Sequence, residues 1–172
     1  MTVIRITDLL APSRVFPHLA VRDREELLRT LALHLATEAG RPADDLVAAV
    51  VAAADRPPLM IRGGVSLLHI FVVDLPSPIA IVARLRHPLD LDGTGGCGTD
   101  VVALLASPAA GVDGHLRALA CLARRLRRSD VLAHVRATKQ RDLMYLALTS
   151  DEWCAPHGAA GSSNSGRGPS AA

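Results

Sequence analysis

The stretch VSLLHIFVV (residues 65–73), followed by DLPSP (74–78) and IAIVA (79–83), is the strongest indication of the fold class of this chain. Both apolar runs are short and rich in β-branched residues, and two prolines lie between them, which predicts two strands separated by a turn. A further run, VVALLA (101–106), is apolar throughout, as expected of a strand buried on both faces. The centre of the chain is therefore predicted to form a sheet.

Helical patterns precede this centre. Asp23 followed by Glu26 resembles a capping box, and leucines at helical spacing lead from there to Gly40, a predicted C-cap residue. A second helix is predicted after Pro42 and is broken by DRPP (55–58). The predicted apolar faces are Leu27, Leu28, Leu31 and Leu35 in the first helix, and Leu46, Val47, Val50, Val51 and Ala54 in the second.

Three more helices are predicted after the strands, the first capped by Asp113 and the others at 131–137 and 140–148. Helices on both sides of a strand-rich centre predict an α/β fold, a central mixed β-sheet flanked by helices on both faces, in one domain over residues 1–150. The remainder, 151–172, is rich in Gly, Ser and Ala and is predicted to be a disordered tail. The predicted apolar face of the Asp113 helix is Leu116, Leu119, Leu122, Ala123 and Leu126.

Composition limits the classes of site and partner. Hydrophobic residues make up 49% of the 172 residues but aromatic residues only 2%, and the formal charge of +2 points to neither a nucleic-acid nor a membrane partner. Cys97, Cys121 and Cys154 are too scattered for a metal-ligand pair or a disulfide framework, so we expect reduced thiols and no metal. The N-terminus lacks a signal-peptide core, and a charged residue and prolines interrupt the longest apolar stretch (67–83). We therefore expect a cytoplasmic protein with no direct membrane insertion.

The glycine-rich segment matches a nucleotide-binding pattern only in letters. Gly93, Gly95 and Gly98 fit G-x-G-x-x-G, but a predicted strand follows, so no helix N-terminus would receive a pyrophosphate. A Walker lysine, an H-E-x-x-H and a G-x-S-x-G are also missing from the sequence. We predict no cofactor.

Two histidines are the candidates for chemistry. His69 ends the string GGVSLLH (63–69), a glycine pair followed by a strand, and His115 lies in the first turn of the Asp113 helix. Taken alone, His69 is interpreted as a structural histidine of an apolar strand and His115 as a solvated residue at a helix start.

Four strings of the chain, in the right order, resemble the phosphotransferase-system (PTS) IIA proteins of the fructose/mannitol type, and within them the nitrogen-regulatory branch. The resemblance covers roughly residues 4–150 and implies the α/β fold of that family. It also implies that His69 is the phosphorylated histidine and that His115 is the second active-site histidine. The strings are ITDLLAP (6–12), IRGGVSLLH (61–69), ARLRHPLDLD (83–92) and GHLRALA (114–120).

The phosphorylation motif departs from the family pattern at three positions. Leu68 stands where the family has proline, Ile70 where it has a small residue, and Arg62 where it has glycine. The segment before His69 is also short, so Arg56 is our candidate for the family's active-site arginine, with Arg62 as the alternative.

The resemblance implies a bacterial phosphoryl carrier that acts in nitrogen or carbon regulation. His69 would take a phosphoryl group from a histidine-phosphorylated, HPr-like carrier protein, and a neutral His115 and an arginine would stabilise it. A IIB domain, a sensor kinase or a transporter are the further partners. Two alternatives stay open: the IIA component of a fructose-type sugar uptake system, and a non-catalytic regulatory binding module of the same fold.

The last helices are basic. Residues 114–145 contain eight Arg or Lys against Asp130 and Asp142, a local charge of 8 − 2 = +6, concentrated in RRLRR (124–128). Because aromatic stacking partners are almost absent, we favour a solvated helix face, or a docking surface for an acidic partner, over nucleic-acid binding.

Overall fold

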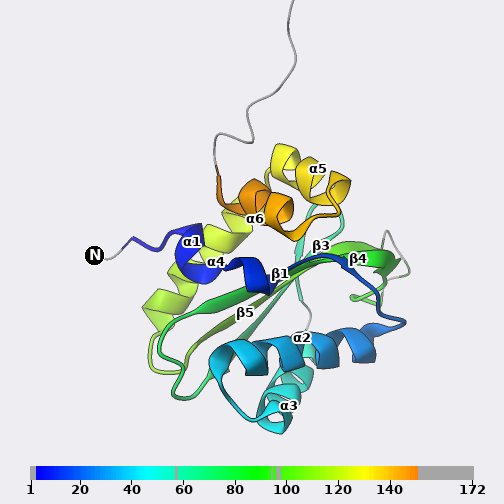
Figure 1. Cartoon of the computed structure of the whole chain (residues 1–172). Helices are drawn as coiled ribbons and strands as arrows, with labels where there is room; N and C mark the ends of the chain where they lie inside the picture. Colours follow the sequence, from blue (N-terminus) through cyan, green and yellow to red (C-terminus); the bar gives the residue numbers. More distant parts are fainter. Residues whose placement is uncertain (1–2, 57, 94, 96–97, 151–172) are drawn as a thin grey trace, which may run out of the picture.

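The central sheet has five strands in the order β1-β4-β5-β3-β2 (Figure 1). The computed structural model describes residues 3–150 apart from 57, 94, 96 and 97. Pairing is parallel for β1 with β4 and for β3 with β5, and antiparallel for β4 with β5 and for β2 with β3, so the predicted mixed sheet is confirmed. The strands are β1 (Val15–Leu19), β2 (Leu59–Ile61), β3 (Val65–Val72), β4 (Ile79–Leu89) and β5 (Thr99–Pro108).

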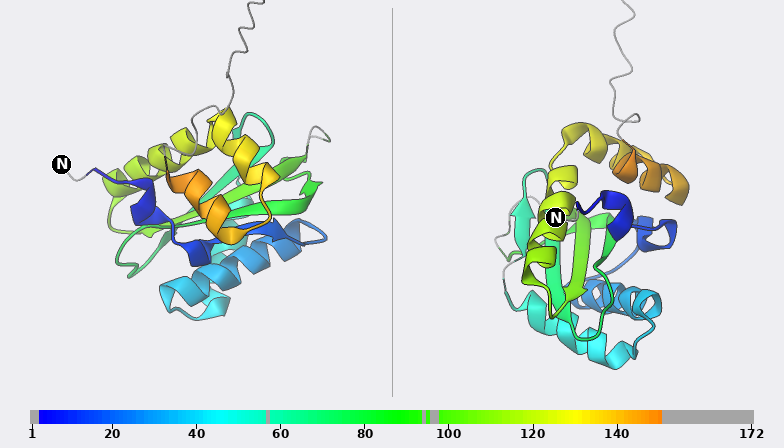
Figure 2. Two further views of the ribbon diagram at one scale, coloured as in Figure 1. Left: turned by 45° about the horizontal axis from the view of Figure 1, so that its top comes forward. Right: turned by 90° about the vertical axis from the view of Figure 1, so that its left-hand side faces the viewer.

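Helices cover both faces of the sheet, as predicted. As drawn in Figure 1, α2 and α3 lie below the sheet, and α1, α4, α5 and α6 lie above it, an arrangement that Figure 2 shows from two further sides. The bounds are α1 (Ile6–Leu9), α2 (Arg24–Ala39), α3 (Ala43–Ala54), α4 (Val112–Leu126), α5 (Ser129–Ala137) and α6 (Arg141–Thr149), with a 3₁₀ turn at Pro12–Arg14. Among the described residues, no helix is both long enough and apolar enough to span a bilayer. The predicted tail, 151–172, lies outside the described residues.

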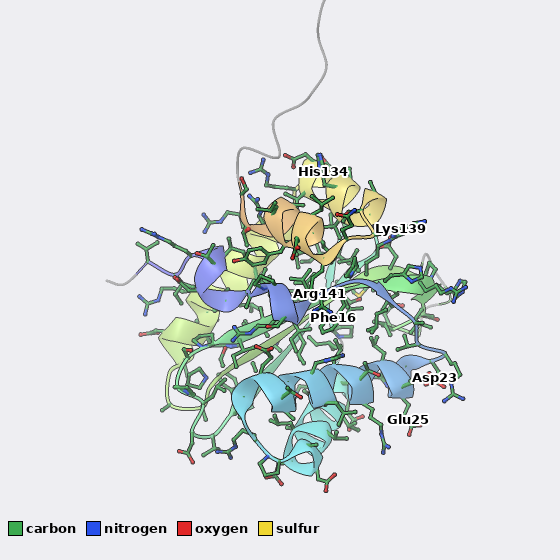
Figure 3. The ribbon with its side chains drawn as sticks, in the orientation of Figure 1. Phe16, Asp23, Glu25, His134, Lys139 and Arg141 are labelled. Atoms are coloured by element: carbon green, nitrogen blue, oxygen red, sulfur yellow. The ribbon has the colours of Figure 1, made fainter. Side chains whose placement is uncertain are left out.

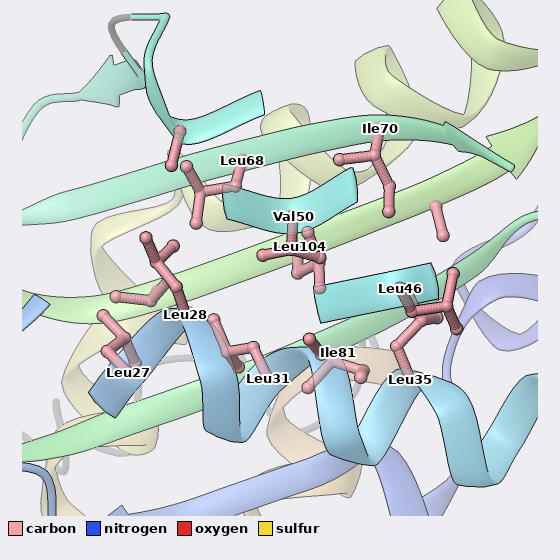
Figure 4. Packing of buried hydrophobic residues seen from close by; sticks show 14 of the residues in the cluster. Leu27, Leu28, Leu31, Leu35, Leu46, Val50, Leu68, Ile70, Ile81 and Leu104 are labelled. Carbon is pink, nitrogen blue, oxygen red and sulfur yellow. The ribbon is translucent and has the colours of Figure 1, made fainter. Parts of the chain in front are cut away.

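Alternation along the strands divides the core into two clusters, because successive side chains point to opposite faces of a sheet. The upper cluster joins β3 residues such as Val65 and Leu67 to α4, α5 and α6. The lower cluster joins Leu68 and Ile70 to α2 and α3 (Figure 4).

The predicted helix ends and faces are mostly confirmed. Asp23 Oδ1 accepts the Glu26 N–H at 2.8 Å, and Gly40 ends α2 with φ +61°. The Glu26 carboxylate accepts the N–H of Arg22 rather than that of Asp23, so the cap is not a capping box. The four predicted leucines of α2 are buried. Val51 and Leu116 are exposed and were assigned wrongly, because α3 packs through positions four residues apart (46, 50 and 54), and α4 packs through Ala118, Leu122 and Leu126.

One predicted strand end is wrong, and two strands were not predicted. The prediction ended β4 at Ala83, but the strand continues to Leu89 through an irregular register after Arg84, where Pro88 need not donate to a regular ladder. β1 and β2 were not predicted because β1 contains Pro17 and β2 has only three residues. Tertiary contacts hold β1. The centroid of the Phe16 ring lies 4.2 Å from that of the His34 ring. The Arg141 guanidinium lies 5.7 Å from the Phe16 centroid, and both of these residues are labelled in Figure 3.

The turn between β2 and β3 is fixed by its glycines and by α5. Gly63 and Gly64 have φ of +86° and +78°. The Gly64 carbonyl accepts the N–H groups of Asp100 and Val101, at 2.9 and 3.2 Å. Arg136 donates to the Gly63 carbonyl and forms an ion pair with Asp100 at 2.6 Å. This turn therefore anchors the start of β3.

Gly64→Ala is expected to destabilise the fold. A Cβ at this position would lie 3.0 Å from Asp100 Oδ1 and 3.3 Å from the Gly98 carbonyl oxygen, at a φ that side chains rarely adopt. We expect a loss of about 1–3 kcal/mol in the free energy of unfolding, measured in urea. Gly114→Ala in α4 is the matched control, because nothing lies within 4 Å of its Cβ, and it should gain roughly 0.5–1 kcal/mol. Equal stability of the two variants would show that the Gly64 turn tolerates a side chain.

Candidate functional site

His69 is an exposed side chain in the middle of β3. Beyond Leu67 the β3 edge has no strand partner among the described residues, because β2 pairs only with residues 65–67. On its other side β3 pairs with β5, and His69 lies opposite Leu105 in that register. The histidine therefore stands on the upper face of the sheet, on a rigid strand with one open edge.

His115 is buried, with 3% of its surface exposed. The expectation of a solvated residue at the helix start is therefore wrong. The predicted cap is also wrong: α4 begins at Val112 after the N-cap Gly111, and Asp113 is an exposed first-turn residue that does not cap. Because the first turn of α4 packs on the end of β5, the imidazole points into the protein rather than into solvent.

The structure brings the two histidines together. Their ring centroids are 5.0 Å apart, and the Phe71 ring lies 4.4 Å from that of His115. Sequence reasoning paired the histidines only through the family resemblance; the parallel pairing of β3 and β5 and the position of α4 supply the contact.

Ser107 orients His115 and was not identified from the sequence. Its Oγ lies 2.9 Å from His115 Nδ1, and the serine is fully buried. A buried hydroxyl needs a hydrogen-bond acceptor. Among the described residues, the hydrogen-bond partner of the Ser107 hydroxyl is His115 Nδ1. The favoured arrangement has Ser107 donating to Nδ1, which leaves the proton of a neutral His115 on Nε2 as a free donor. The apolar strand around Ser107 gave no signal of this role.

The surroundings keep His115 neutral. Burial lowers its pKa below the usual 6.5, and the positive charge of a protonated His69 lowers it further. The start of α4 also disfavours an imidazolium. Because the unfolded chain takes up this proton at a higher pH than the fold does, His115 reduces the free energy of unfolding as the pH falls through about 6.5.

The structure separates the two candidate arginines. Arg56, just after α3, lines a small cavity of about 30 Å³ together with His69. Arg62 lines a different cavity, between β2 and α4. Of the two, Arg56 is therefore the arginine that shares a cavity with His69.

Several large apolar side chains of β3, of the turn after it and of α4 are not buried. Phe71 lies on the face of β3 that carries His69, Val73 directly follows the strand, and Val112 and Leu116 lie one turn apart on α4. Their exposed fractions are 45%, 63%, 60% and 56%. We call these four residues the apolar rim. Sequence reasoning missed it because helical spacing alone assigned Leu116 to the core.

Comparisons with known proteins identify the family of this chain. The family profile described as "Phosphoenolpyruvate-dependent sugar phosphotransferase system, EIIA 2" matches residues 8–150. A protein named "Nitrogen regulatory protein" from Bradyrhizobium diazoefficiens is 30% identical over 143 residues, 83% of this chain and 94% of the relative.

Two solved structures share the fold. The nitrogen regulatory protein IIA-Ntr from Neisseria meningitidis superposes with a TM-score of 0.75 at 18% identity, covering 84% of this chain and 98% of that one. Enzyme IIA mannitol from Escherichia coli, solved in complex with phosphorylated enzyme IIB mannitol, superposes with a TM-score of 0.64 at 14% identity, covering 81% and 96%.

Removal of the Ser107 hydroxyl should change the tautomer of His115. In the unmodified protein, ¹⁵N NMR above pH 7 should show a protonated Nε2 and an unprotonated Nδ1. Ser107→Ala should populate the Nδ1–H form, because Nδ1 loses its donor. Ser107→Thr, which keeps the hydroxyl, is the control and should preserve the original tautomer. A protonated Nδ1 in the unmodified protein would contradict the assignment.

Proposed function

This chain belongs to the EIIA 2 family of the phosphoenolpyruvate-dependent sugar phosphotransferase system, and we propose that its His69 accepts a phosphoryl group and passes it on. The observation that carries the proposal is the pairing of an exposed His69 with a buried His115 whose ring centroid lies 5.0 Å away. The first ring is accessible to a partner, and the second is held as a neutral donor.

The transfer step uses only groups of the two proteins. The lone pair of one His69 ring nitrogen attacks phosphorus on the donor's phosphohistidine, a new N–P bond forms, and the donor's N–P bond breaks with its electron pair returning to the donor imidazole. His115 Nε2–H donates to a phosphoryl oxygen, and the Arg56 guanidinium adds positive charge. Such a step depends mainly on positioning and charge stabilisation, so the mechanism assigns no role to a cofactor or metal.

The apolar rim supports docking of a protein donor. Four large apolar side chains on the elements that carry the histidines are each 45–63% exposed, and Phe71 contacts His115; we expect them to be covered when a partner binds. We assign this surface to a histidine-phosphorylated, HPr-like carrier protein. A IIB domain is the acceptor suggested by the mannitol complex among the structural relatives.

The relatives named as nitrogen regulatory proteins support a regulatory role rather than dedicated sugar uptake. A cytoplasmic location and a sensor kinase or transporter as the regulated target are part of the same proposal.

One of the motif departures weighs less against transfer than the sequence alone suggested. Leu68 and Ile70 belong to the lower cluster, on the face of β3 opposite to His69. Leu68 also lines the small cavity that Arg56 shares with His69, whereas Ile70 does not. The position of Ile70 favours the carrier over a non-catalytic binding module of the same fold.

His69→Ala should abolish acid-labile phosphorylation by the phosphoenolpyruvate-driven carrier cascade, because it removes the attacking nitrogen. His115→Ala should still be phosphorylated, roughly ten- to a hundredfold more slowly, since one hydrogen bond to a charged group is worth about 1.5–3 kcal/mol. The matched control is His87→Ala, an exposed histidine of β4, which should behave as the unmodified protein. If the unmodified protein takes up no phosphate, the binding-module alternative is correct.

The two arginines should respond differently. Arg56→Gln should slow phosphorylation about ten- to a hundredfold, because it removes the positive charge beside His69. Arg62→Gln should leave the rate unchanged, because this arginine lines a separate cavity. Single-turnover transfer of ³²P from the carrier measures both. An Arg62→Gln protein slower than Arg56→Gln would reverse the assignment.

A further inference from the structure

A second cavity, of about 470 Å³, lies between the edge strand β2 and the end of α4. Its volume is within the roughly 300–1,000 Å³ of small-molecule pockets. It shares no lining residue with the cavity at His69, as far as the described residues extend, and the phosphoryl-transfer step makes no use of it. Its lining is Leu59, Met60, Ile61, Arg62, Ala123 and Arg127.

Among the described residues, no acid compensates the positive charge of this cavity. Arg62 and Arg127 are its charged residues, and no carboxylate of the described residues lines it. Within the described part of the chain neither arginine has an ion pair, whereas Arg14, Arg128 and Arg136 are each paired with an acid. Two guanidinium groups on one cavity repel each other, and a bound anion would turn this repulsion into attraction.

Part of the cavity wall is apolar. Leu59 points to the same face of the sheet as Leu67 opposite it and is 45% exposed, whereas the Met60 side chain points to the other face, where its Sδ accepts from Ser66 Oγ. Ala123 adds an apolar wall from α4. Apolar walls flanked by two cations match a ligand that combines an anionic group with an apolar body.

We propose that this cavity binds a small amphiphilic anion, a molecule with one carboxylate, phosphate or sulfonate group next to an apolar part. Arg62 and Arg127 would hold the anionic group, and Leu59, Ile61 and Ala123 would cover the apolar part. The proposal does not rest on phosphoryl transfer at His69, and either can fail without the other.

Arg62 distinguishes this cavity from the pattern of the resembled family. Arg62 stands where the phosphorylation motif of the resembled family has glycine, so the family pattern supplies no charge at this point. It lies directly before the Gly63–Gly64 turn that Arg136 and Asp100 hold. The hairpin therefore presents Arg62 from a fixed backbone.

The test uses 8-anilinonaphthalene-1-sulfonate, an amphiphilic anion whose fluorescence increases on binding, with the full chain. We expect Arg62→Gln and Arg127→Gln each to weaken binding several-fold and the double variant at least tenfold. Arg124→Gln, the same charge change at an exposed position of α4 outside the cavity lining, is the control and should bind as the unmodified protein. Amide shifts in ¹⁵N NMR should concentrate in residues 59–62 and 123–127.

Competition distinguishes the anion classes, since displacement by benzoate or by phenyl phosphate identifies a carboxylate or a phosphate ligand. Unchanged binding in the double variant would overturn the proposal, because the dye would then lie elsewhere, for example on the apolar rim. Failure of both competitors, combined with arginine-dependent binding of a poly-glutamate peptide, would overturn it in favour of an acidic protein segment. Loss of phosphorylation in His69→Ala with intact dye binding would show that the two sites are separate.

Discussion

The parallel ladder between β3 and β5 sets the positions of both the histidines and the helices around them. It runs in unbroken register from Val65 opposite Val101 to Val72 opposite Pro108. The same ladder places His69 on the upper face and brings Ser107 to the point where α4 begins. A slip of one residue would turn His69 into the lower cluster and Leu68 towards the partner surface. The glycine turn held by Arg136 fixes the register at its start.

The candidate site uses two histidines in opposite environments. One ring is exposed, whereas the buried ring is hydrogen-bonded to Ser107, and burial lowers its pKa and so favours its neutral form. Burial of His115 is compatible with the fold because Ser107 satisfies one of its nitrogens. The apolar rim then provides contact area around a polar centre, the arrangement expected of a surface that binds another protein and releases it after the reaction.

The arginines are distributed by tertiary structure rather than by sequence. The run 124–128 predicted one basic face, but Arg125 is buried and donates to the carbonyls of Ala147 and Ser150 at the end of α6. Arg128 pairs with Asp130 at 2.7 Å, and Arg127 turns to the cavity beside β2. Arg125 therefore holds helices together, Arg128 neutralises an acid and Arg127 lines a cavity, whereas Arg124 is exposed on α4.

Local patterns in the sequence were sufficient to predict the mixed α/β fold, the two long N-terminal helices and, through the family resemblance, both histidines. These features depend on periodicity, caps and motif strings, which are properties of neighbouring residues. Contacts between distant segments decide that β1 and β2 are strands, that Leu116 is exposed, that Arg56 rather than Arg62 shares a cavity with His69, and that Ser107 hydrogen-bonds His115. Residues 56 and 69, for example, line one cavity because the end of α3 returns to the sheet edge. A local pattern states which face of an element is apolar, but the packing of neighbouring elements decides how much of that face is covered.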